Sequence, residues 1–186
     1  MKKILFLALM LLAIDLLQAQ QKINVTTGTK LQYSVSVQGQ TFLFFIRVDS
    51  FSATHLALTW KFEDGRSGRF VATKSSIDSA TIGYYNQPID QEEIRLPGNQ
   101  LILFLSKSVF DNLTKKGKSE FDAAKIKVKP YSGDTHFSLN GQLIDAIHVE
   151  SESGAIFWIL NSATAPLILK TLNNPAGVDV ELMSVE

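Results

Sequence analysis

Three histidines, His55, His136 and His148, are the side chains of this sequence best suited to acid–base chemistry or metal binding near neutral pH. If Asn140-Gly141 forms a two-residue hairpin turn, His136 lies opposite Asp145, and His148 projects from the other face. This register predicts a cross-strand contact between His136 and Asp145 and no metal site shared with His148. Because no nucleophile is placed beside the pair, we interpret it as a polar contact and not as a catalytic dyad.

Other motifs of catalytic proteins are missing from the sequence. It has no cysteine, which excludes disulfides, thiol catalysis and thiolate metal sites. It also has no His-Glu-x-x-His, no Gly-x-Ser-x-Gly and neither glycine-rich phosphate loop. Asp90, Glu92 and Glu93 lie in a polar stretch bounded by prolines, which is typical of solvated loop charges. We therefore expect a protein that is not an enzyme and has no catalytic residues, no metal and no cofactor.

Aromatic residues are the more suggestive feature of the sequence. The chain has 12 Phe, 4 Tyr and 2 Trp, and many of them fall within predicted strands. Two interpretations stay open: the rings fill a closed core, or they line a hydrophobic cavity of the kind that small barrels offer to apolar ligands. On the second interpretation, the candidate ligand-binding residues are Phe42, Phe44, Trp60, Phe62 and Trp158.

The segments that carry these rings alternate between apolar and polar residues, which is the pattern of β-strands. The N-terminal third predicts an antiparallel meander, with turns at Gly39 and at Asp64-Gly65. In the second strand of this meander, Phe42, Phe44, Ile46 and Val48 share one face. Strands are predicted at 31–38, 40–51, 55–62, 67–72, 101–105, 125–129, 135–139, 142–150, 155–160, 166–172 and 178–185.

One helix is predicted between the strands. Ser106 or Ser108 can cap its start, Gly117 can end it, and the apolar residues between them fall on one face. The three lysines of 125–129, followed by Pro130, indicate an edge strand.

Several predicted strands are apolar on both faces. A flat sheet with one solvent-exposed face would leave half of these apolar side chains in water. The runs are 42–48, 155–160 and 167–172. The expected fold is therefore mainly β: a single curled antiparallel sheet or half-open β-barrel of about nine to eleven strands with one short helix.

The N-terminal stretch has the features of a bacterial signal peptide. Lys2 and Lys3 form a basic region, an apolar run follows from Ile4 to Ile14, and Ala19 offers a small residue at the cleavage point. The run is too short to span a membrane. We predict that residues 1–19 are removed, that residues 20–186 form a single β-rich domain, and that the protein is exported to the periplasm or secreted.

Charge limits the partners of the mature chain. Without Lys2, Lys3 and Asp15, the 18 basic and 18 acidic residues become 16 and 17, a net charge of about −1. This excludes a globally basic nucleic-acid binder. Seven lysines gather between positions 107 and 129, either as a solvated surface or as a local positive face for anionic headgroups or another envelope component. They are Lys107, Lys115, Lys116, Lys118, Lys125, Lys127 and Lys129.

Two short patterns carry a resemblance to a known group of proteins. The strand-rich region begins with Gly28-Thr29-Lys30-Leu31-Gln32-Tyr33, followed by the meander. It ends with Phe157-Trp158-Ile159-Leu160, Pro166-Leu167-Ile168-Leu169-Lys170 and Val180-Glu181-Leu182. In this it resembles uncharacterised exported bacterial envelope proteins that share a domain of unknown function. The resemblance implies a curved antiparallel sheet similar to that of periplasmic lipoprotein carriers, with a helical lid over an apolar concavity.

Two functions are compatible with these patterns. The first is a non-enzymatic soluble envelope protein that binds a lipid or other apolar ligand in its curled β-sheet. The second is a structural or interaction module with a closed, packed core that docks another envelope protein. On either reading we expect no nucleic acid partner and no transmembrane segment in the mature chain.

Overall fold

A computed structural model describes residues 20–131 and 135–186 of the chain. The predicted signal peptide, residues 1–19, lies outside the described residues. The elements in chain order are β1 (Lys30–Val37), β2 (Gln40–Phe51), β3 (His55–Phe62), β4 (Ser67–Thr73), α2 (Lys74–Ser79), β5 (Ile82–Gly83), β6 (Glu93–Arg95), β7 (Gln100–Leu101), α3 (Lys107–Lys116), β8 (Lys118–Phe121), β9 (Ala124–Val128), β10 (Ser138–Leu139), β11 (Gln142–Leu143), β12 (Ala146–Ser151), β13 (Ile156–Leu160), β14 (Ile168–Leu172) and β15 (Val178–Val185).

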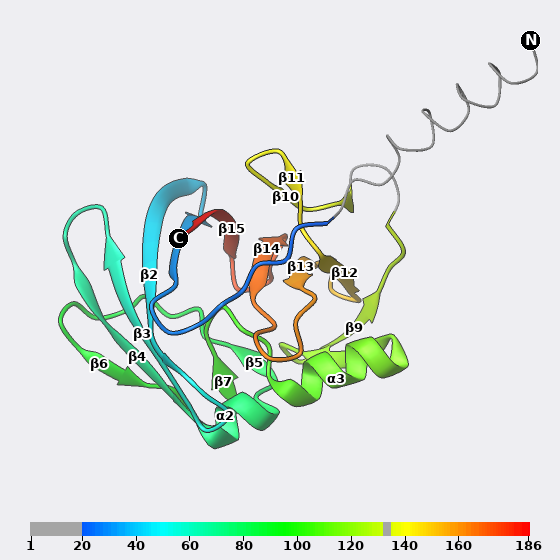
Figure 1. Cartoon of the computed structure of the whole chain (residues 1–186), viewed down its shortest axis with the longest axis horizontal. Coiled ribbons are helices and arrows are strands. Elements are labelled where there is room, and N and C mark those ends of the chain that lie inside the picture. The colour runs from blue at the N-terminus through cyan, green and yellow to red at the C-terminus, as the bar shows by residue number, and fades with distance from the viewer. Residues whose placement is uncertain (1–19, 132–134) are drawn as a thin grey trace, which may run out of the picture.

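Eleven strands form one sheet that curls without closing into a barrel (Figure 1). Their order is β6-β4-β3-β2-β1-β15-β14-β13-β12-β9-β8, and the pairings are antiparallel except for that of β4 with β6. Two further pairs, β10 with β11 and β5 with β7, lie outside this sheet. The predicted fold class, a mainly β protein built on one curled antiparallel sheet, is confirmed.

The meander β1–β4 follows the alternation of the sequence. Gln38 and Gly39 both have positive φ, 50° and 81°, which the tight turn between β1 and β2 requires. Tyr33 lies opposite Phe44 across this turn, and Phe44 lies opposite Phe62 on β3. The side chains at alternate positions of β2 and β3 are buried on the inner face, as predicted.

The last strand of the chain joins the two halves of the sheet. β15 pairs with β1 over almost its whole length, from Leu31 opposite Val185 to Val37 opposite Val178. Its other neighbour, β14, is paired with it through Lys170 and Glu181, whose side chains also form an ion pair of 3.0 Å. Because the β14–β15 ladder is so short, the sheet can bend sharply between these two strands. We call this line the β14–β15 seam.

Two apolar clusters occupy opposite faces of the sheet near β13. Trp158 and Leu160 point into the larger cluster, which fills the inside of the curl. Phe157 and Ile159 point into the smaller cluster, which α3 covers (Figure 1). The predicted strand with two apolar faces at 155–160 is confirmed, and its second face is buried because a helix packs on it.

The helix α3 has the caps that the sequence predicts. Ser106 Oγ accepts a hydrogen bond from the Val109 N–H, and Gly117 ends the helix with φ 68°. A second helix, α2, was not predicted. It has six residues, and its N-cap residue, Thr73, makes no side-chain capping bond. Its local signals are therefore weak, and contacts with β4 and α3 hold it in place.

Several local predictions differ from the structure. The predicted strand 135–139 shortens to β10, and the predicted strand 142–150 divides into β11 and β12. The lysine-rich strand β9 is not at the edge, because it pairs with both β12 and β8. The segment 101–105 is not one strand, because Leu103 has φ 58° and interrupts the extended backbone. The side chains of His136 and Asp145 do not pair: His136 stacks on Tyr131 with ring centroids 4.4 Å apart, and Asp145 accepts a hydrogen bond from Asn161.

Candidate ligand-binding cavity

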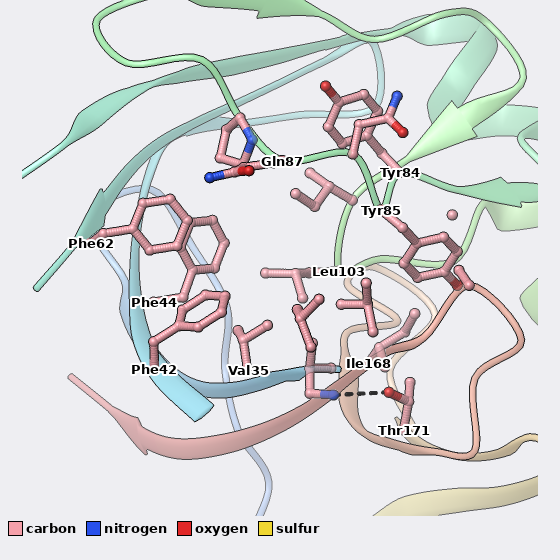
Figure 2. A pocket seen from close by; sticks show the side chains of 18 of the residues that line it. Val35, Phe42, Phe44, Phe62, Tyr84, Tyr85, Gln87, Leu103, Ile168 and Thr171 are labelled. Carbon is pink, nitrogen blue, oxygen red and sulfur yellow. Dashed lines mark hydrogen bonds between the residues drawn. The ribbon is translucent and has the colours of Figure 1, made fainter. Parts of the chain in front are cut away.

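The curl of the sheet encloses a cavity of about 730 Å³ (Figure 2). Strands β1, β2, β3, β14 and β15 form its floor and sides, and the segments 83–88 and 101–103, which begin at the ends of the short strands β5 and β7, cover it. The lining residues are Val35, Val37, Gln38, Gln40, Phe42, Phe44, Phe62, Glu63, Asp64, Arg66, Gly83, Tyr84, Tyr85, Asn86, Gln87, Pro88, Leu101, Ile102, Leu103, Ile168, Thr171, Ala176, Val178 and Val180.

Three phenylalanines form one wall of the cavity. The Phe62 ring lies 5.4 Å from that of Phe42, edge to face, and 4.9 Å from that of Phe44, measured between centroids. These are the separations at which aromatic pairs attract each other. Phe44 and Phe62 are buried, whereas Phe42 is half-buried at the side of the cavity. The wall is therefore apolar and held in place by contacts among its own rings.

Aliphatic side chains form the opposite wall. Leu103 and Ile168 face the phenylalanines across the cavity (Figure 2). Leu103 has the left-handed backbone conformation noted above, which is uncommon for a residue with a branched side chain. The two residues that follow Leu103 are also buried. The N–H of Ile168 donates to the carbonyl oxygen of Leu103 at 2.7 Å. This bond ties the covering segment to β14.

The cavity lies beside the β14–β15 seam. Where a ladder ends, backbone groups need other partners, and here side chains supply them. The Val180 N–H donates to Thr171 Oγ1 at 2.9 Å, and the Tyr33 hydroxyl donates to the Ile168 carbonyl oxygen at 2.8 Å. The first bond links β15 to β14 and the second links β1 to β14. Lining residues come from both sides of the seam, Ile168 and Thr171 on β14 and Val178 and Val180 on β15.

The cover over the cavity is a coil segment and not a helical lid. Tyr84 packs its ring edge to face on Phe70, at 5.5 Å between centroids. The hydroxyl of Tyr85 donates to Asp122 Oδ2 at 2.5 Å, and the Gly83 N–H donates to Asp122 Oδ1 at 2.7 Å. Asp122 lies in the turn between β8 and β9, so the segment 83–88 is anchored at the far edge of the sheet.

The burial of this anchor changes the pKa values of its groups. Burial raises the pKa of Tyr85 far above its ordinary value of 10.0, and the adjacent Asp122 carboxylate raises it further. Burial also raises the pKa of Asp122 above 3.8, although the hydrogen bonds from Tyr85 and Gly83 oppose the shift. Tyr85 therefore stays protonated and donates to Asp122 throughout the physiological pH range.

Polar side chains gather at the exposed mouth of the cavity, where β3 turns into β4. The Arg66 guanidinium lies over the Phe62 ring, with its carbon 4.8 Å from the centroid, and its Nε donates to Asp64 Oδ2 at 2.8 Å. The backbone N–H and side chain of Arg66 lower the pKa of Asp64 below 3.8. Glu63 accepts a hydrogen bond from the Leu43 N–H at 3.3 Å. The mouth thus holds two carboxylates and one guanidinium that is already paired.

The structure brings three of the five predicted ligand-binding residues together. Phe42, Phe44 and Phe62 line the cavity. Trp60 does not line it: its side chain is fully buried behind Phe44 and Phe62, at 6.4 Å and 5.4 Å between centroids. Trp158 lies on β13 beneath the segment that follows residue 134, where its indole N–H donates to the Thr135 carbonyl oxygen at 2.6 Å.

Other lining residues were not singled out from the sequence. Val35 and Val180 lie in strands with alternating apolar and polar residues, so the sequence predicts that they point inward. It does not predict that they lie near Phe42. The pair Tyr84-Tyr85 lies in coil and follows no periodic pattern. Two adjacent aromatic residues in an otherwise polar, turn-rich stretch were the one signal available for them.

The lysine-rich segment between positions 107 and 129 is partly neutralised. Lys107 and Lys115 both lie beside Asp111, at 2.8 and 3.4 Å. Lys127 lies 3.9 Å from Glu152, and Lys129 lies 3.3 Å from Glu150. These pairings favour a solvated surface over a strong positive face.

Searches for a metal site, for a membrane-spanning helix and for related proteins give no positive result for the described residues or the sequence. Within residues 20–131 and 135–186, no group of three His, Asp or Glu side chains is placed to hold a metal ion. No helix of that same part of the chain is long and apolar enough to cross a membrane. No family model matches the chain, and no curated protein matches it significantly.

Proposed function

We propose that this protein is a non-enzymatic envelope protein, exported by its N-terminal segment, that binds a lipid or other apolar ligand inside its curled sheet. The observation that carries the proposal is the cavity of about 730 Å³ between β1–β3, the β14–β15 seam and the covering coil. Sites for small molecules have volumes of about 300–1,000 Å³ and are mostly apolar with a few polar groups. This cavity has both properties.

The lining of the cavity favours a flexible hydrocarbon over a polar ligand. Its inner surface comes from side chains such as Val35, Phe44, Leu103 and Ile168, and the hydroxyl of Thr171 is already bonded to Val180 and Asp179. Each methylene group taken from water contributes about 0.8 kcal/mol. An acyl chain with about ten buried methylenes would gain about 8 kcal/mol before the cost of association.

A substitution inside the cavity tests the proposal. Val180→Trp on β15 places a large side chain in the cavity, whereas Met183→Trp on the same strand adds the same side chain at a position that is 45% exposed and outside the lining. We expect native mass spectrometry to show uptake of 1-monooleoylglycerol by the wild-type protein and by Met183→Trp but not by Val180→Trp. No uptake by the wild type would contradict the proposal.

The alternative function, an interaction module with a closed core, has less support. Such a module needs a packed interior, and its aromatic residues would serve packing alone. Trp60 and Trp158 fit that description, but Phe42, Phe44 and Phe62 border open space. Equal stability and no ligand uptake for both tryptophan variants would favour the interaction module.

A further inference from the structure

The charged side chains at the mouth of the cavity limit the kind of headgroup that the ligand can have. This inference rests on the proposed function. Exposed lining residues define the mouth, and apart from Ala176 they are all polar or charged. They are Gln38, Gln40, Glu63, Asp64, Asn86 and Gln87, and half-buried Arg66 lies beside them. A ligand with its hydrocarbon inside the cavity must place its polar end among these groups.

Among the described residues that line the mouth, Arg66 is the one cation, and its charge is balanced by a neighbouring carboxylate. Asp64 accepts hydrogen bonds from both the backbone N–H and the Nε of Arg66, at 3.0 and 2.8 Å. The guanidinium also lies over the Phe62 ring. A carboxylate or phosphate at the Nη atoms of Arg66 would meet two nearby carboxylates, Asp64 and Glu63, so three negative charges would share one positive charge.

The polar groups deeper in the site cannot receive a headgroup either. The Thr171 hydroxyl bonds with Val180 and Asp179, and the Tyr85 hydroxyl donates to Asp122. A headgroup buried there would lose its water without gaining equivalent bonds. The headgroup therefore stays at the mouth.

The side-chain amides at the mouth suit a neutral headgroup. Gln38, Gln40, Asn86 and Gln87 are exposed, and each amide offers two N–H donors and a carbonyl acceptor. Hydroxyl, ester and amide groups can bond to these side chains and carry no charge to be repelled by Glu63 and Asp64. We propose that the ligand is a neutral acyl lipid, an acyl chain joined to an uncharged headgroup with hydroxyl, ester or amide groups.

Two probes with the same hydrocarbon test the proposal. 1-Monooleoylglycerol and oleate are titrated below their aggregation concentrations, at pH 8.5, against the wild-type protein loaded with the neutral dye Nile red. We expect 1-monooleoylglycerol to displace the dye at a concentration about fivefold or more lower than oleate, as suits one uncompensated charge near a protein surface. Equal displacement, or stronger displacement by oleate, would overturn the inference and leave the apolar cavity in place.

Failure of the proposed function gives a different result, because neither lipid would then displace the dye and native mass spectrometry would show no uptake. That outcome removes the inference together with its basis.

A charge variant with a matched control isolates the effect of the mouth. Gln87→Lys adds a cation at the mouth, and Gln142→Lys adds the same charge at an exposed position of β11, outside the cavity lining. We expect Gln87→Lys to shift the ratio of the oleate affinity to the 1-monooleoylglycerol affinity about fivefold toward oleate, whereas Gln142→Lys leaves that ratio unchanged. An equal shift in Gln142→Lys would attribute the effect to overall charge and contradict the inference.

The double variant Arg66→Gln, Asp64→Asn addresses a competing route, in which Arg66 binds the carboxylate of the ligand. It removes one positive and one negative charge, so the net charge of the mouth stays the same. If that route operates, the double variant weakens oleate binding specifically, and the inference is wrong. We expect instead that it changes oleate and 1-monooleoylglycerol binding to the same small extent.

Discussion

The hydroxyl of Tyr85 lies 2.5 Å from Oδ2 of Asp122 and joins the cover of the cavity to the turn between β8 and β9. The second oxygen of the same carboxylate accepts the Gly83 N–H. Asp122 has φ 52°, a conformation that Asn and Asp tolerate better than most residues. One carboxylate in a left-handed turn thus holds both ends of a three-residue stretch of the covering segment.

Removing this carboxylate should loosen the cover. We expect Asp122→Ala to lower the free energy of unfolding by about 1–3 kcal/mol, because it leaves buried donors of Gly83 and Tyr85 without their acceptor. Asp122→Asn keeps one acceptor oxygen and suits the positive φ, so its loss should be smaller. Urea denaturation measures the difference, and hydrogen exchange should show faster exchange at residues 83–88 in Asp122→Ala. Unchanged exchange there would contradict the anchoring role.

The pH dependence of stability should distinguish Asp122 from an exposed, ion-paired carboxylate. Burial raises the pKa of Asp122 in the folded state above 3.8, so its contribution to stability is fully present below pH 3.8 and is lost as the pH rises through the folded pKa. We expect the stability of the wild type relative to Asp122→Asn to fall as the pH rises from 3.8 through the folded pKa of Asp122.

Asp64 provides the opposite case as a control. Its pKa is lowered by Arg66, so its contribution is present above pH 3.8 and is lost as the pH falls through the folded pKa. The wild type compared with Asp64→Asn should therefore lose stability on acidification. The measurement is urea denaturation from pH 3 to 8, and the same sign for both pairs would contradict the assignment.

Trp60 and Phe42 should separate packing from ligand binding. Trp60→Ala removes a fully buried side chain and should cost about 3–5 kcal/mol of stability. Phe42 is half-buried in the cavity wall, so Phe42→Ala should cost about 1–2 kcal/mol and weaken the binding of an acyl probe more than its stability loss accounts for. Thermal denaturation and dye displacement measure the two effects.

A glycine beside Trp60 tests the same packing from the other side. A Cβ on Gly68 would lie 2.5 Å from Cζ2 of Trp60 and 2.8 Å from the Glu92 carbonyl oxygen. Gly68→Ala should therefore destabilise the wild type, and part of that loss should disappear in the Trp60→Ala background. Additive losses would mean that the ring and the glycine do not contact each other.

Tyr33 should matter through a single hydrogen bond. Its fully buried hydroxyl reaches from β1 past β15 to the carbonyl of Ile168 on β14. Tyr33→Phe keeps the ring and leaves that carbonyl without its partner, so we expect a loss of about 1–2 kcal/mol in urea denaturation. Tyr84→Phe, on the cover, is the matched control, and an equal loss there would argue against a special role of the β14–β15 seam.

The N-terminal prediction has its own measurement. Expression of the full chain in a bacterium should release a product whose mass corresponds to residues 20–186, since Ala19 is the small residue that the cleavage site needs. Ala19→Phe should leave the longer precursor, whereas Gln21→Glu, just after the site, should be cleaved normally. A mature product that retains residues 1–19 would contradict the predicted signal peptide.

The sequence by itself determined the parts of this protein that depend on near neighbours. Alternation predicted the faces of β2 and β3, Asn140-Gly141 predicted the register of its hairpin, and Ser106 and Gly117 predicted both ends of α3. Each of these signals works over a few residues, because strand period, turn geometry and helix capping are local properties.

Only the tertiary structure decided where a cavity forms and which rings line it. Phe42, Phe44, Trp60 and Phe62 look alike in the sequence, since all four lie on the inner face of the meander. Trp60 became core and the three phenylalanines became a cavity wall because of distant segments: the left-handed turn at Leu103, the anchor at Asp122 and the short pairing of β14 with β15. Whether an inward ring meets another side chain or open space depends on such long-range packing, which periodicity along one strand does not encode.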